Sequence, residues 1–100
     1  MHEKIFAALR RGAHAEALSL ARVAVAEDPH DARAYALLAH AERAAGDSAA
    51  AMHAINRAVL LAPDDAGIHF QRVGFLLGES KVDEADAALK RTIDLDPNQF

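Results

Sequence analysis

Three prolines recur in this chain at a constant spacing of 34 residues, at Pro29, Pro63 and Pro97. Similar phrases lead into them, with Leu60-Leu61-Ala62 before the second and Asp94-Leu95-Asp96 before the third. A fixed period between about 20 and 50 residues is the signature of stacked structural repeats, because each unit buries its apolar face only against its neighbours. The spacing therefore predicts a repeat architecture and excludes most folds with a single irregular core.

The composition narrows the kind of repeat and the class of protein. Hydrophobic residues make up 52% of the 100 residues and aromatic residues only 5%. Alanine is the commonest of the hydrophobic residues. Because it is the best helix former and is small, it favours closely packed helices. The absence of cysteine excludes disulfides and cysteine-ligated metals, and it fits a cytoplasmic protein. No apolar run predicts a signal peptide or a membrane span, and the net charge of −4 argues against nucleic acid as the partner.

The chain divides into helix–turn–helix units at about 1–31, 32–65 and 66–99, which we interpret as one domain. In the middle unit, Asp31 is placed to cap a first helix that runs from Ala32 to about Ala45. Gly46 ends that helix, and Asp47 or Ser48 opens a second one that runs to about Leu61 before Pro63 stops it.

The third unit repeats this plan, and the first lacks the start of its opening helix. In the third unit Gly78-Glu79-Ser80 is expected to form the turn, and Ser80 with Asp83 resembles a capping box for the second helix. In the first unit Gly12 marks the turn between two short apolar patterns. No segment is predicted to be a strand or a flexible linker.

The chain resembles the tetratricopeptide repeat family. The middle unit carries the family pattern best, and the outer units match it at fewer positions. The matching residues of the middle unit are Tyr35, Leu38, Ala39, Gly46, Asp47, Ala51, Ile55, Ala58 and Pro63. The resemblance implies an all-α fold, a right-handed superhelical solenoid of antiparallel helix pairs. In it Ala39, Ala51 and Ala58 would lie where helices cross closely.

The resemblance also implies a function, the binding of a protein or peptide segment in a concave groove that the opening helices line. Such a protein is a scaffold and not an enzyme. Carried over by position, the groove residues would be Phe6, Leu9, Arg10, Arg33, Ala36, Leu37, His40, Arg43, Phe70, Gln71, Gly74 and Leu77, together with His2 and Gly67. One subclass of the family clamps a C-terminal carboxylate with Lys and Asn. Because His2, Phe6 and Gly67 occupy the corresponding places here, we expect no such clamp.

Positive charge is concentrated on the opening helices, although the chain as a whole is acidic. They carry six basic and three acidic residues, whereas the rest carries five basic and twelve acidic ones. The nine charged residues are Lys4, Arg10, Arg11, Arg33, Arg43, Arg72, Glu3, Glu42 and Glu79. One interpretation is an acidic ligand that the groove attracts electrostatically. The other is that these charges only solvate the first helices.

Metal binding and catalysis find little support in the sequence. No two of the six histidines are three or four residues apart, so no helix face presents a pair of ligands. His40, beside Arg43, could make binding sensitive to pH, and His69 is expected to pack between helices. No catalytic triad spacing and no glycine-rich phosphate loop is present, and we expect no cofactor.

Two alternatives to the scaffold remain open. Tetratricopeptide repeats often precede glycosyltransferase, sulfotransferase or hydroxylase domains, so the chain could be the leading part of a larger enzyme. Alternatively, the last helix, with Leu89 and Ile93, could pair with a second copy of the chain to form a homo-oligomer. We favour a longer repeat array, in which Phe100 would begin the next opening helix.

Overall fold

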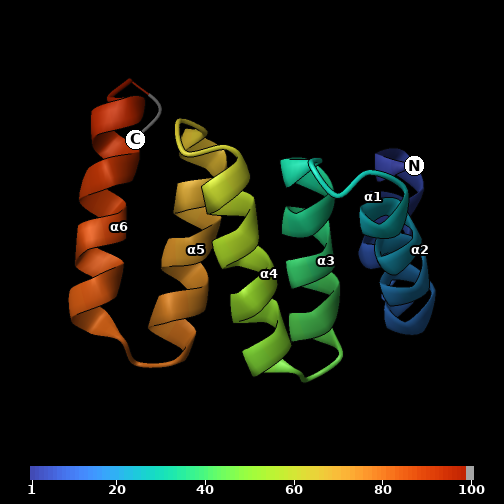
Figure 1. Ribbon diagram of the computed structural model, residues 1–100. Helices are drawn as coiled ribbons and strands as arrows, with labels where there is room; N and C mark the ends of the chain where they lie inside the picture. The colour runs from blue at the N-terminus through green and yellow to red at the C-terminus, as the bar shows by residue number, and fades with distance from the viewer. Residues whose placement is uncertain (99–100) are drawn as a thin grey trace.

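Six α-helices follow one another along the stack in the computed structural model, which describes residues 1–98 (Figure 1). No strand occurs in this range, and the predicted all-α helical repeat fold is confirmed. The expected end of the third unit and the expected role of Phe100 lie outside the described residues. The helices are α1 His2–Arg10, α2 His14–Glu27, α3 Ala32–Ala44, α4 Ser48–Leu61, α5 Ala66–Gly78 and α6 Val82–Leu95.

The helices stack so that α3 occupies the middle of the array. It contacts α1, α2, α4 and α5, whereas α6 contacts α5 alone within residues 1–98. The opening helix α1 has 9 residues, whereas α3 and α5 have 13 each. None of the helices in the described range has both the length and the apolar character needed to cross a membrane.

Alanine makes most of the buried contacts between these helices. Ala39, Ala51 and Ala58 are at most 2% exposed, in agreement with the prediction that small residues lie where helices cross. Larger side chains fill the spaces between the crossings, and Ile55 on α4 is fully buried. Because protein interiors are close-packed, helices that meet through methyl groups leave no room for larger side chains at the same positions.

Aspartate side chains cap three of the helices, α3, α4 and α5. Asp31, Asp47 and Asp65 each accept a hydrogen bond, at 3.0–3.1 Å, from the backbone N–H three residues later. Such a bond satisfies one of the N–H groups that the first turn of a helix leaves without a partner. The predicted starts of α3 and α4 are therefore confirmed.

The turns inside the helix pairs need a left-handed backbone conformation. Gly12 and Gly46 have φ angles of 75° and 91°, which glycine adopts without a steric penalty. The corresponding residue between α5 and α6 is Ser80, with a φ of 60°. The predicted capping box of Ser80 is therefore wrong, because Ser80 forms the turn and α6 begins at Val82 without a side-chain cap.

We predict that enlarging a buried crossing residue destabilises the whole stack. Ala39→Leu should lower the free energy of unfolding by roughly 1–3 kcal/mol, because the added carbons must displace neighbouring helices. Urea denaturation followed by circular dichroism measures the change. Ala49→Leu, at an exposed position of α4, is the matched control, and an equal effect of both changes would contradict the role of close crossings.

A second prediction concerns the turn at Ser80. Ser80→Gly should raise the free energy of unfolding by about 1 kcal/mol, because glycine removes the left-handed strain that serine carries. Gly46→Ser should have the opposite sign. The same denaturation experiment measures both, and a destabilising Ser80→Gly would show that the turn is not strained.

Candidate functional site

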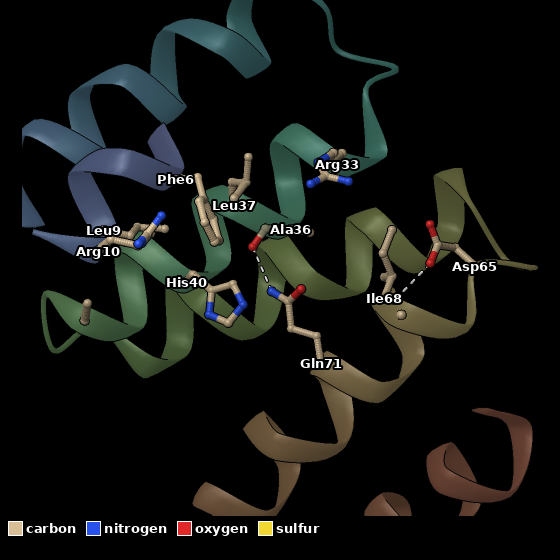
Figure 2. A pocket seen from close by; sticks show the side chains of 12 residues that line it. Phe6, Leu9, Arg10, Arg33, Ala36, Leu37, His40, Asp65, Ile68 and Gln71 are labelled. Atoms are coloured by element: carbon tan, nitrogen blue, oxygen red, sulfur yellow. Dashed lines mark hydrogen bonds between the residues drawn. The ribbon is translucent and has the colours of Figure 1, made fainter. Parts of the chain in front are cut away.

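The concave side of the stack is hollowed by a cavity of about 530 Å³ between α1, α3 and α5 (Figure 2). We call it the central cavity. Its wall combines aliphatic and aromatic side chains with arginine and histidine. The lining residues are Phe6, Leu9, Arg10, Arg33, Ala36, Leu37, His40, Ala44, Asp65, Gly67, Ile68 and Gln71.

A second cavity, of about 650 Å³, continues along α5 toward α6, and we call it the C-terminal cavity. His40, Gly67 and Gln71 line both cavities, so the two form one surface that we call the groove. The remaining lining residues of the C-terminal cavity are Arg43, Phe70, Val73, Gly74, Phe75, Leu77 and Leu89. Opening helices contribute nearly all of the groove.

The structure brings together all twelve residues that the sequence placed in the groove, since each lines at least one cavity. Their role in binding stays a prediction. Sequence reasoning missed six of the lining residues: Ala44, Asp65, Ile68, Val73, Phe75 and Leu89. Phe75 could have been found, because it lies four residues after Gln71 and hence on the same face of α5.

His2 lies outside both cavities, contrary to its predicted place in the groove. Its ring Nε2 donates to Asp31 Oδ2 at 2.6 Å, which joins the start of α1 to the start of α3. Burial acts to raise the pKa of the Asp31 carboxyl, but the hydrogen bonds from the Ala34 N–H and from His2 outweigh it. The pKa of Asp31 therefore lies below its ordinary value of 3.8.

A side-chain bridge crosses the middle of the groove. Gln71 Nε2 on α5 donates a hydrogen bond of 2.8 Å to the Ala36 carbonyl oxygen on α3 (Figure 2). His40 lies beside this bridge in the same view. Polar groups thus gather at the place where the two largely apolar cavities meet.

The Phe75 ring on α5 packs against both His40 and Arg43. The His40 ring meets the Phe75 ring edge to face, with centroids 5.6 Å apart and planes at 88°. The Arg43 guanidinium carbon lies 4.8 Å from the centroid of the same ring. Both arrangements are favourable for an aromatic face, which carries partial negative charge.

Glycine at position 78 makes room for the Arg43 side chain. A Cβ atom at Gly78 would lie 3.0 Å from an Arg43 guanidinium nitrogen, closer than such contacts normally come. The absence of a side chain at Gly78 thus leaves room for the guanidinium over the end of α5. A larger residue there would require the Arg43 side chain to shift.

The cations of the groove differ from most others in the chain. Arg10, Arg33 and Arg43 have no carboxylate within salt-bridge distance among residues 1–98, and the Arg10 guanidinium carbon lies 5.8 Å from the centroid of the Phe6 ring. The basic side chains that do pair with carboxylates lie elsewhere: Arg11, Arg72, Lys81, Lys90 and Arg91. The charge of the groove is therefore not neutralised within the described chain.

The histidines show no sign of a metal centre in the part of the chain that the structure describes. No group of three or more side chains with ligand chemistry comes together there. His69 is buried, as predicted, and its Nε2 donates a hydrogen bond of 2.8 Å to the Pro63 carbonyl oxygen. This histidine ties α5 to the turn before it.

His40 is the titratable group whose surroundings matter most for the groove. Partial burial lowers the pKa of its imidazole below the ordinary 6.5, and the positive charge of Arg43 lowers it further. His40 is therefore neutral at neutral pH, and it gains a proton only when the solution is acidified or when a negative charge arrives nearby.

We predict that the pKa of His40, followed by NMR titration of its ring signals, lies below 6.5. Arg43→Gln should raise it part of the way back, because the repulsion is lost while the burial remains. Arg33→Gln should leave it unchanged. Identical titration curves for wild type and Arg43→Gln would show that Arg43 does not act on His40.

The family model of the tetratricopeptide repeat matches residues 8–73 of the chain. The chain therefore belongs to the tetratricopeptide repeat family, as its sequence pattern predicted. None of the curated proteins matches it.

Solved structures agree with this assignment. MamA from Desulfovibrio magneticus is 25% identical with a TM-score of 0.90, and the match covers 97% of this chain and 55% of that one. The first repeat domain of human RPAP3 is 24% identical with a TM-score of 0.91, and the match covers 99% of this chain and 78% of that one. The Yersinia enterocolitica secretion chaperone SycD was solved with a peptide of the translocator YopD. It is 20% identical with a TM-score of 0.88, and the match covers 97% of this chain and 74% of that one. The chain thus spans about half the length of MamA.

Proposed function

We propose that the chain is a protein-interaction module that takes up a peptide or protein segment in its groove, and that it is not an enzyme. The observation that carries this is the exposure of large apolar side chains on a hollowed surface. Phe6, Phe70 and Leu77 are 52%, 47% and 54% exposed, and all three line the groove. Apolar side chains gathered in a concavity are typical of binding sites.

The fold supports this function because one protein of similar structure was solved with a bound peptide. SycD was solved with a peptide of YopD, so a chain with this arrangement of helices can hold a peptide. In the present chain, Phe6, Leu9, Phe70 and Leu77 would make the apolar contacts. Arg10, Arg33, His40 and Arg43 would make the polar ones, and their charge favours an acidic segment.

The proposal predicts that peptides can be selected on the chain and that their binding depends on the groove. A random dodecapeptide library displayed on phage is selected on the immobilised chain, and enriched peptides are measured by fluorescence anisotropy. Phe6→Ala/Phe70→Ala should weaken their binding by about tenfold or more, because two apolar anchors are lost. Alanine keeps the helices intact.

The matched control removes apolar surface from outside the groove. Val23→Ala/Leu60→Ala trims side chains that are 45% and 73% exposed on α2 and α4, and it should leave the affinity unchanged. Failure to enrich any peptide would contradict the proposal. So would an equal loss of affinity in the groove variant and the control.

A further inference from the structure

Two nitrogen-bearing side chains share one aromatic ring at the point where the two cavities meet. The His40 ring packs edge to face with this ring, Phe75, and the Arg43 guanidinium carbon lies 4.8 Å from its centroid. Both side chains line the C-terminal cavity, and His40 lines the central cavity as well. Neither has a carboxylate partner within residues 1–98. Glu79 lines a small pocket beside Arg43, but its carboxylate pairs with Lys81 at 3.4 Å. His40 and Arg43 are therefore two nitrogen-bearing groups without a carboxylate at ion-pair distance.

Arg43 already packs on the Phe75 ring in the absence of a ligand. The Phe75 ring supports its guanidinium, and the missing side chain at Gly78 lets that guanidinium pass at close range. A side chain that is already ordered loses less conformational entropy on binding. Its planar fork of N–H groups matches the two oxygens of a carboxylate.

We propose that His40 and Arg43 form a carboxylate-binding centre, and that the segment in the groove carries an aspartate or glutamate with apolar residues on both sides. The proposal rests on the proposed function, because it specifies what that same groove recognises. The centre differs from the clamp of the known subclass, whose places are taken here by His2, Phe6 and Gly67.

The position of the centre favours a side-chain carboxylate over the carboxylate at the end of a chain. Largely apolar cavities of about 530 and 650 Å³ continue on either side of His40. A bound segment can therefore run past the centre in both directions and place apolar side chains in each cavity. A chain terminus held at the centre would leave one cavity empty.

The charges around the centre agree with an acidic partner. Arg10 and Arg33 line the central cavity and have no carboxylate partner in the described chain. Asp65 is the acidic residue among the described lining residues, and its Oδ1 atom accepts a hydrogen bond from the Ile68 N–H at 3.1 Å. The groove therefore presents a net positive potential to an approaching segment.

Binding of a carboxylate should change the protonation of His40. The His40 ring packs against Phe75 on α5, and Arg43 lies on the same helix. The other charged residues lining the cavities around it are Arg10 on α1, Arg33 on α3 and the acidic Asp65, which caps α5. Positive groups outnumber this one carboxylate, so a bound carboxylate would supply the negative charge that favours imidazolium. The pKa of His40 would rise, protons would be taken up on binding, and affinity would increase as the pH falls from about 7.5 toward 6.

The test uses peptides enriched from the dodecapeptide library and made with amidated C-termini. We expect an acidic residue between apolar ones, and Arg43→Gln should weaken binding of these peptides by about tenfold or more. A peptide with Asn or Gln in place of its acid should lose no further affinity from Arg43→Gln. The matched control is Arg57→Gln on α4, at an exposed position outside both cavities, which should leave the affinity unchanged.

Calorimetry at pH 7 in two buffers of different ionisation enthalpy then measures proton uptake. Proton uptake should accompany binding to wild type and disappear in His40→Gln. A variant that only lost packing contacts would bind more weakly but would still take up protons. Enriched peptides without an acidic residue, or equal binding to wild type and Arg43→Gln, would overturn this proposal and leave the proposed function standing. A library that yields no binder would overturn both.

Discussion

Close contact between helices through alanine is the constraint on which the rest of the structure depends. On α3 the residues Ala34, Ala36, Ala39 and Ala41 are all buried, and this helix touches four of the other five. Where backbones come so near, the long side chains have room only at the borders of each contact. Some of them fill the spaces between helices, and others, such as Phe6 and Leu77, are left on the concave side. The groove is therefore a consequence of how the core is packed.

The arginines of the groove can remain without carboxylate partners at little cost to the stability of the fold. Pairs between exposed side chains, such as that of Arg11 with Glu16, contribute little to stability, because water already solvates both charges. Leaving Arg33 and Arg43 without carboxylates consequently costs the fold little. Their charge remains available on a surface with low-dielectric walls, where it acts over a longer distance than it would in open water.

The sequence predicts those features that depend on local chemistry. Asp31 as a cap, Gly46 as a turn and Pro63 after α4 could all be located because each needs only its near neighbours. The repeat register then placed His40 and Arg43 on the concave side. Contacts between distant residues escaped prediction: His2 meets Asp31 across 29 positions, and Gln71 reaches Ala36 across 35. Whether a side chain lines the groove or bonds to another helix depends on how the helices pack in three dimensions. The 34-residue spacing of the repeats does not determine that packing.

The position of α6 has a consequence for how the groove responds to heat. Within the described chain α6 rests on α5 alone, whereas α3 is enclosed on several sides. In repeat proteins each unit draws its stability from the neighbours it contacts, so the contacts described here give α6 less support than α3. The C-terminal cavity lies between α5 and α6 through Phe70, Leu77 and Leu89. A segment bound there would add contacts to this pair, so occupancy of the C-terminal cavity would protect it from thermal opening more than occupancy of the central cavity protects α3.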